Sequence, residues 1–399
     1  MIQPASHQRT SALKFNDHNI AKTLAASALT FFAIGSAAQV VSPYTVQPGS
    51  VMSPYWVYSG AFKEYRNKSL HPPASKVREL QIASGQTLPA ALVQQADAVA
   101  NSPIRVTLTL IDKGQVVYRR NRDEVNDDSL VISYSMAKSL TSLMVGHAFC
   151  DGHIKDLDEK LGDYVPELVN TAYGRSSIRH VLNMASGANS SGENGNAFPG
   201  VDAALRSQQI SYLETLLKYK DAKPRLFGVL APGDAFDYKN LDTAALSILV
   251  EKATKRPFQQ WYAETLVPAA GLARITAWNL DKDNRPLAHG FFYATPDDWL
   301  RLALYSLDVY KGRAGACLQG YMQQAMTKGI RIYNHSQYAS YGHQFWTGMK
   351  GANSEVFWMR GYGGQYIGVD PKKERLLVAA STKEEPSVLN LFANWVNHD

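Results

Sequence analysis

The fold is decided by residues Val131–Leu168, which read VISYSMAKSLTSLMVGHAFCDGHIKDLDEKLGDYVPEL. In the first half of this stretch, apolar residues recur with the spacing of one helix face. They are Met136, Leu140, Leu143, Met144 and Ala148. The pair Asp151-Gly152 ends the pattern, so we predict a helix that begins at Ser135. Lys138 lies one turn further on, on nearly the same side of that helix.

The Ser-x-x-Lys spacing of Ser135 and Lys138 suits nucleophilic catalysis. A serine hydroxyl attacks well only when a base removes its proton, and a lysine serves as that base only when it is uncharged. Burial and the positive end of a helix both favour the uncharged amine. The backbone N–H of Ser135 can also stabilise an oxyanion. The same motif recurs at Ser11 and Lys14, however, so a helix-capping serine with a solvated lysine stays open as the alternative.

Two further stretches carry candidate site residues. In APGDAFDYKNLDTAALSILVEKAT, residues 231–254, Tyr238 and Asn240 follow a turn and precede an apolar helix, where side chains can point into a cleft. A packed tyrosine with a capping asparagine is the alternative there. In FWMRGYGGQYIGVDPKKERLLVAAS, residues 357–381, glycines beside apparent strand residues indicate a close approach of backbone to a ligand, or a tight turn. These glycines are Gly361, Gly363 and Gly364.

Strand signals lie near both ends of the chain, and helical patterns fill its middle. Alternating apolar residues around Leu108, followed by the turn Asp112-Lys113-Gly114, predict a β-hairpin. Glu374–Thr382 reads as a strand, and an amphipathic helix closes the chain. A helical region inserted into a sheet domain, of the α/β or α+β class, is the simplest architecture that accommodates this order.

The bulk composition excludes several classes of protein. With 45% hydrophobic and 19% charged residues, the chain of 399 residues is ordinary for a globular protein. Its net charge of +6 is weak for nucleic-acid binding. The ten histidines form neither a His-Glu-x-x-His motif nor a cluster with zinc spacing, so we expect no metal and no cofactor. Cys150 and Cys317 are the two cysteines; they can pair in an exported protein, but a buried free thiol is our expectation.

The N-terminus resembles an export leader. Lys14 and Lys22 precede the apolar segment Leu24–Ile34, which suits a signal h-region and is short for a membrane span. Small residues allow cleavage after Ala38, so we expect a periplasmic or secreted protein. Because no charge occurs between Lys22 and Lys63, an uncleaved membrane anchor stays open as the alternative.

The order Ser-x-x-Lys, Tyr-x-Asn and glycine-rich strand is similar to that of the serine β-lactamase and penicillin-binding-protein superfamily. The sequence resembles its class C-like branch, from about residue 100 to the C-terminus. The similar stretches include LIDKGQVVYRR, YSMAKSLTSLMVG, DGHIKDLDEKLGDYVPEL, SSIRHVLNMASG and HGFFYATPDDWLRLALY. Within that branch, SMAKS, GYGGQYIGVDP and a Ser-to-Tyr interval of 103 residues resemble the 6-aminohexanoate-oligomer (nylon-oligomer) hydrolases and related esterases.

This resemblance implies a β-lactamase-like fold, an antiparallel sheet flanked by helices with an inserted, mostly helical region at about 155–285. The hydrolase domain then spans 100–399, after a leader at 1–38 and an N-terminal extension at 39–99. The implied partner is a small amide or ester substrate. Nucleic acid is not expected, the membrane is a partner only if the leader stays attached, and the oligomeric state is left open.

The resemblance also implies acyl transfer through an ester on Ser135. Lys138 would be the base, Tyr238 would share its proton and pass it to the leaving group, and Asn240 would hydrogen-bond the substrate. The backbone N–H groups of Ser135 and Tyr362 would form the oxyanion hole.

One departure from the pattern bears on the substrate. The family's Lys-Thr-Gly triplet falls at Met359-Arg360-Gly361, where only the glycine matches. Met359 carries no charge for a substrate carboxylate, and strand alternation turns Arg360 to the opposite face. We therefore expect an amidase or esterase, with a β-lactamase, a D-amino-acid peptidase and a non-catalytic penicillin-binding sensor as alternatives. The segment 188–203 also departs from the nylon-oligomer hydrolases, which leaves amide activity open.

Overall fold

The computed structural model describes residues 68–189, 204–205, 208–224, 226, 228–333 and 335–398. The expected leader and residues 190–203 lie outside this part of the chain. Among the described helices, none is long and apolar enough to cross a membrane.

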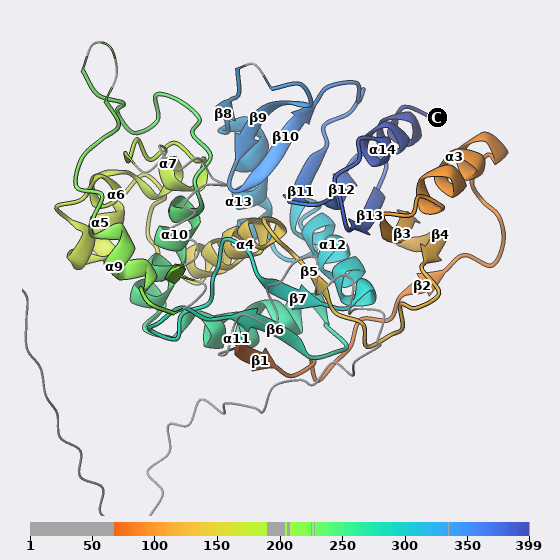
Figure 1. The fold of residues 1–399 in the computed structure, drawn as a ribbon, viewed down its shortest axis with the longest axis horizontal. Coiled ribbons are helices and arrows are strands. Elements are labelled where there is room, and N and C mark those ends of the chain that lie inside the picture. Colours follow the sequence, from red (N-terminus) through yellow and green to blue (C-terminus); the bar gives the residue numbers. More distant parts are fainter. Residues whose placement is uncertain are drawn as a thin grey trace, which may run out of the picture. The chain divides into compact units, whose positions relative to one another are not determined.

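A nine-stranded sheet forms the centre of the described structure (Figure 1). Its strands, in spatial order, are β2 (Gln81–Ile82), β4 (Gln115–Asn121), β3 (Arg105–Asp112), β13 (Arg375–Ser381), β12 (Gln365–Asp370), β11 (Phe357–Gly361), β10 (Phe345–Met349), β9 (Tyr338–Gly342) and β8 (Ile330–Arg331). Neighbouring strands run antiparallel, as expected, except that the short edge strand β2 runs parallel to β4. The expected hairpin is β3–β4, which turns at Lys113-Gly114.

Helices cover both faces of this sheet because its strands are apolar on both sides. On β13, Leu376, Val378 and Ala380 join the core under one set of helices, and the alternate residues Leu377 and Ala379 join the other core. The first set comprises α4 (Met136–Cys150), α12 (Pro296–Tyr310) and α13 (Ala316–Thr327). The second comprises α3 (Ala90–Ala100) and the C-terminal α14 (Ser387–Asn397) (Figure 1).

A small second sheet leads into α4 and was not expected from the sequence. Its antiparallel strands, in order, are β1 (Lys68–His71), β6 (Thr276–Asn279), β7 (Phe292–Ala294) and β5 (Val131–Ile132). Directly after β5, the N–H of Ser133 donates to Phe292 O at 2.7 Å, and the N–H of Phe292 donates to Ser133 Oγ at 3.1 Å. These bonds fix the backbone just before Ser135.

The region between α4 and β6 is mostly helical. It contains α5 (Leu161–Tyr164), a 3-10 turn (Pro166–Leu168), α6 (Ala172–Arg175), α7 (Ile178–Leu182), α9 (Tyr212–Leu216), α10 (Asn240–Thr254) and α11 (Phe258–Ala270). Gly174 is the point of closest packing among the short helices, since a Cβ there would lie 2.0 Å from Leu168 O. The long apolar helix α10 packs against α4 and thereby places its own N-terminus beside Ser135.

A β-hairpin turn locks the large sheet to these helices. His343 and Gln344, between β9 and β10, both have positive φ, 44° and 64°, as a two-residue type I′ turn requires. Ser139 Oγ donates to Gln344 O at 2.7 Å, and Thr243 Oγ1 donates to Gln344 Oε1 at 2.7 Å. Gln344 Nε2 donates to Leu182 O at 2.9 Å. One buried glutamine therefore bonds to α4, α7 and α10 together.

The two cysteines form a disulfide, so the expectation of a buried free thiol is wrong. Cys150 ends α4 in a half-buried position, and Cys317 is exposed in α13, with the Cα atoms 5.7 Å apart. Helix periodicity indicates which face Cys150 occupies but says nothing of α13, which lies 167 residues away. A cross-link of this kind typically stabilises a fold by about 2–4 kcal/mol, because it restricts the unfolded chain.

Candidate active site

Ser135 lies at the start of α4 without capping it. Its side chain accepts no hydrogen bond from the backbone N–H groups of the first turn, so the geometry is not that of a capping serine. The preceding residue, Tyr134, has a positive φ of 40°, which is uncommon for a residue other than glycine. Such strained backbone concentrates at functional sites. The serine Oγ is therefore directed to a side chain and not to the backbone N–H groups of its helix.

The side chain of Lys138 is a hydrogen-bond partner of Ser135 Oγ. Its Nζ donates to Ser135 Oγ at 2.9 Å and to the backbone oxygen of His289 at 2.8 Å. The lysine is 1% exposed, and both of these acceptors are uncharged. The amine of Lys138 is therefore held in a buried position within hydrogen-bond reach of Ser135.

Tyr238 completes the cluster from the loop before α10. Its ring centroid lies 5.1 Å from Lys138 Nζ, and its hydroxyl is hydrogen-bonded to Ser135. Burial raises the pKa of Tyr238 to about 12, although the bond to Ser135 and the positive charge of Arg360 act in the opposite direction. The phenol is therefore protonated at neutral pH and has a proton to give. Asn240, expected on the loop, is the first residue of α10.

Buried charges hold the loop that carries Tyr238. Lys239, 2% exposed, places its Nζ 3.5 Å from a carboxylate oxygen of Asp237 and 3.7 Å from one of Asp242. Ser186 Oγ donates to Asp242 at 2.9 Å, and Lys223 pairs with Asp237 at 3.3 Å. Burial raises the pKa of Asp242 to about 6. This cluster was not predicted from the sequence, where its one local signal is a lysine between two candidate site residues.

Gly361 brings strand β11 against the segment that precedes Ser135. A Cβ at Gly361 would lie 2.2 Å from Ser133 O and 3.1 Å from Tyr134 Cβ, so the approach needs a glycine. Tyr362 follows and is 61% exposed, with its ring centroid 5.6 Å from that of Tyr134 in an edge-on arrangement. The end of β11 therefore adjoins the start of α4. Gly363 and Gly364 form the turn into β12, with positive φ.

Met359 and Arg360 lie on opposite faces of β11, as strand alternation predicts. Met359 is fully buried in the core beneath α4. Arg360 lies among aromatic rings on the other face, with its guanidinium carbon 5.2 Å from the ring centroid of Tyr338. Neither side chain supplies an exposed cation beside Ser135.

The backbone oxygen that binds Lys138 is itself supported by a buried pair. The His289 ring hydrogen-bonds through Nδ1 to the hydroxyl of Tyr212, which opens α9. Tyr212 is fully buried and His289 is 4% exposed. The sequence offers no signal for this support, because a carbonyl oxygen is present in every residue.

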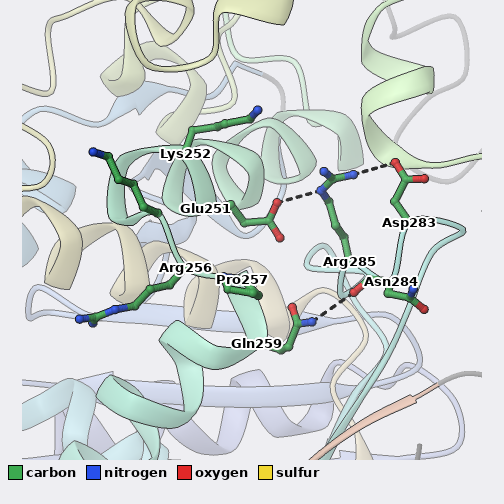
Figure 2. Close-up of a pocket in the computed structure, with 9 residues that line it drawn as sticks. Glu251, Lys252, Arg256, Pro257, Gln259, Asp283, Asn284 and Arg285 are labelled. Carbon is green, nitrogen blue, oxygen red and sulfur yellow. Dashed lines mark hydrogen bonds and ion pairs between the residues drawn. The ribbon is translucent and has the colours of Figure 1, made fainter. Parts of the chain in front are cut away.

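A shallow pocket at the C-terminal end of α10 is separate from these groups. Figure 2 shows Arg285 between the carboxylates of Glu251 and Asp283, with contacts of 2.8 Å to each. Arg256 points away from Arg285 in the same view, and both Lys252 and Arg256 pair with acidic residues of their own. None of the expected site residues lines it. Within the described residues there is also no group of three or more His, Cys, Asp or Glu side chains that could hold a metal ion.

The helix-flanked sheet, with Ser135 and Lys138 at the start of α4 and Tyr238 just before α10, defines the class: proteins with the β-lactamase fold. The particular family follows from comparison with known proteins. Residues 94–398 match the Beta-lactamase family model, and the chain belongs to that family.

Two curated relatives match part of the chain. The 6-aminohexanoate-dimer hydrolase of Paenarthrobacter ureafaciens is 24% identical over 268 residues, which cover 63% of this chain and 66% of that protein. A Beta-lactamase of Providencia stuartii is 24% identical over 148 residues, 37% of this chain and 34% of that protein. The chain thus spans just under two thirds and about one third of the lengths of these relatives.

Solved structures share the fold at low identity. A Bacillus anthracis protein assigned as a 6-aminohexanoate-dimer hydrolase aligns with a TM-score of 0.69 and 17% identity, over 86% of this chain and 92% of that chain. EstCE1, a hydrolase with promiscuous acyltransferase activity, aligns with a TM-score of 0.62 and 14% identity, over 77% of this chain and 99% of that chain. A class C β-lactamase in complex with cefoxitin aligns with a TM-score of 0.57 and 16% identity, over 77% of this chain and 98% of that chain. The expected β-lactamase-like fold and superfamily are confirmed.

Proposed function

We propose that the protein is a serine hydrolase that cleaves ester or amide bonds of small substrates through an acyl-enzyme on Ser135. The observation that carries this proposal is the 2.9 Å hydrogen bond from a buried lysine amine to a serine Oγ that does not cap its helix. A nucleophile within hydrogen-bond reach of its base is the minimal arrangement for covalent catalysis.

In this mechanism Ser135 Oγ attacks the substrate carbonyl carbon while its proton passes to Lys138 Nζ. The N–H groups of Ser135 and Tyr362 stabilise the oxyanion, and Asn240 orients the substrate. On collapse, the bond to the leaving group breaks and that group takes the phenol proton of Tyr238. Lys138 then returns a proton to Tyr238. Water adds to the ester, gives up a proton along the same path, and releases the acid as Ser135 regains its hydrogen.

The proposed substrate class is supported by the relatives and by the presence of Met359 at the position of the family's triplet lysine. We propose 6-aminohexanoate-oligomer-like amides or carboxylic esters, which is supported by similarity to a 6-aminohexanoate-dimer hydrolase. A β-lactamase or D-amino-acid peptidase remains the second candidate, favoured by the match to the Beta-lactamase family. Met359 argues against fast β-lactam hydrolysis, because its side chain is apolar and buried where the triplet lysine would stand.

We expect short-chain p-nitrophenyl esters to turn over many times and nitrocefin or benzylpenicillin to react slowly. A charge-assisted hydrogen bond contributes about 1.5–3 kcal/mol, so the missing lysine costs roughly ten- to a hundred-fold in kcat/KM for substrates with a carboxylate. Ester and amide leaving groups on one acyl series, including a 6-aminohexanoate dimer, measure the preference. A kcat/KM for nitrocefin far above that of the best ester would favour the β-lactamase. Release of a single equivalent would favour the penicillin-binding sensor.

We further propose that the protein is exported and that its leader is removed near Ala38. The disulfide between Cys150 and Cys317 supports an oxidising compartment. N-terminal sequencing of protein from the native host should give a chain that begins near Gln39, outside the cytoplasm. Membrane-bound protein that begins at Met1 would favour the uncleaved anchor instead.

A further inference from the structure

The ring of Tyr238 rests against a partly exposed tryptophan. The indole of Trp346, on β10, is nearly parallel to the Tyr238 ring, with a centroid separation of 5.5 Å and an interplanar angle of 26°. Phe236 and Tyr341 contact both rings from the sides. Of the tryptophans in the described ranges, the other five are almost fully buried in the two cores. Trp346 therefore stands out as the one at the boundary between the core and the site.

The same indole contacts a partly buried cation. The guanidinium carbon of Arg360 lies 5.8 Å from the ring centroid of Trp346, and the arginine side chain is 14% exposed. Its Nη1 donates to Gln337 Oε1 at 2.7 Å, and its Nη2 pairs with the half-exposed carboxylate of Glu384. Attraction between a cation and an aromatic face increases when both are desolvated. Arg360 is thus held in one place, in contact with the ring that stacks on Tyr238.

We infer that Arg360 is a positioning residue for Tyr238: it orients Trp346 against the phenol ring, and its charge stabilises the phenolate that forms when Tyr238 gives its proton to the leaving group. The inference rests on the proposed function, because the proton transfer belongs to that mechanism. It assigns a use to the middle residue of Met359-Arg360-Gly361, which strand alternation turns away from Ser135.

Electrostatics agree in direction, since the positive charge of Arg360 lowers the pKa of Tyr238 against the larger effect of burial. Several other titratable or charged groups surround Tyr238 and Trp346. They are Lys138 from α4, Tyr341 from β9, Asp237 and Lys239 from the loop, Asp242 from α10, and His335 and Tyr338 beside the indole. Arg360 and Glu384 can be changed without altering Ser135, Lys138 or the loop.

The test measures the ionisation of residue 238 directly. Replacing Tyr238 with 3,5-difluorotyrosine, a more acidic phenol, brings the titration into an accessible pH range, where fluorine NMR follows it. Arg360→Gln should raise the midpoint by roughly 0.5 to 1 pH unit, as expected for a unit charge at this range in a partly buried site. Arg360→Lys should restore most of the shift. Glu384→Gln should lower the midpoint, because it removes the negative charge that offsets Arg360.

If Arg360→Gln raises the titration midpoint of residue 238 and Glu384→Gln lowers it, the role of Arg360 is electrostatic and not one of packing alone. With the tyrosine enzyme, Arg360→Gln should lower kcat for a p-nitrophenyl ester by about three- to ten-fold with little change in KM. An unchanged midpoint in a variant that keeps its melting temperature would overturn the inference, and so would shifts of the same sign. If Arg360→Gln does not fold, an unchanged midpoint in Glu384→Gln overturns it alone.

Fluorophosphonate labelling keeps this result apart from the proposed function. If wild type is not labelled on Ser135, the proposed mechanism fails, whatever the titration gives. If Ser135 is labelled and the titration midpoint of residue 238 is unchanged in Arg360→Gln, the mechanism stands and the inference fails.

Discussion

Ser135→Ala is expected to abolish ester turnover, by about 10⁴-fold or more, while the melting temperature stays close to that of wild type. The substitution removes the oxygen that accepts the hydrogen bond from Lys138. It removes no capping hydrogen bond, because the Ser135 side chain accepts none from the backbone N–H groups in the first turn of α4. Activity and stability should therefore separate at this residue.

Labelling identifies the nucleophile independently of turnover. A fluorophosphonate probe should add its mass to the peptide that carries Ser135 and leave Ser11 unmodified. Ser139→Ala is the matched control on the same helix, since Ser139 is 1% exposed and its Oγ is bonded to Gln344 O instead. The control should keep its labelling. Label on another serine, or substantial turnover in Ser135→Ala, would end the proposal of an acyl-enzyme at this position.

The elements with strong local patterns were predicted well. The helix after Ser135 follows from the spacing of its apolar residues, and the structure has it at Met136–Cys150. The hairpin around Lys113-Gly114 and the C-terminal helix carry equally clear signals, and both are present. These signals reside within a dozen residues, so they need no knowledge of the rest of the chain.

The small second sheet has no such signal. Its strand β5 has two residues and β7 has three, too short for alternation to show. Its strand β1, at Lys68–His71, pairs with Thr276–Asn279, so the partners are about two hundred residues apart in sequence. Pairing at this separation is decided by the packing of the helices between the strands, which local propensity does not encode. The disulfide was missed for the same reason.

In the candidate site, the spacing of the motif predicted the contact between Ser135 and Lys138, because residues three apart on a helix are neighbours. It did not predict that the second acceptor of Lys138 is the backbone oxygen of His289, 151 residues further along. Strand alternation predicted that Met359 and Arg360 lie on opposite faces. It did not predict that Trp346 contacts both Arg360 and Tyr238. Side-chain motifs are readable from sequence, whereas the contacts that orient them depend on the assembled sheet.

Lys138→Arg should be nearly inactive, with kcat/KM reduced by roughly 10³-fold or more across the neutral range, within the span that a general base contributes. The reason is specific to protonation: an arginine keeps a positive charge at working pH and cannot take the proton of Ser135. The arginine also brings a wider, planar head into a place where the lysine is 1% exposed. Lys138→Met, which removes the amine without adding a charge, should be inactive as well.

Lys239→Arg is the control that separates loss of a base from loss of a buried lysine. Lys239 is as buried as Lys138, but its Nζ lies near the carboxylates of Asp237 and Asp242, where a permanent positive charge still has its partners. It should therefore lose far less activity than Lys138→Arg. The rate of fluorophosphonate labelling at Ser135 should be measured together with kcat/KM in both variants. It compares activation of the serine in Lys138→Arg and Lys239→Arg without a step in which an amine or alcohol leaves. An active Lys138→Arg that labels as fast as wild type would transfer the role of base to Tyr238, whose phenol would then have to ionise before the attack.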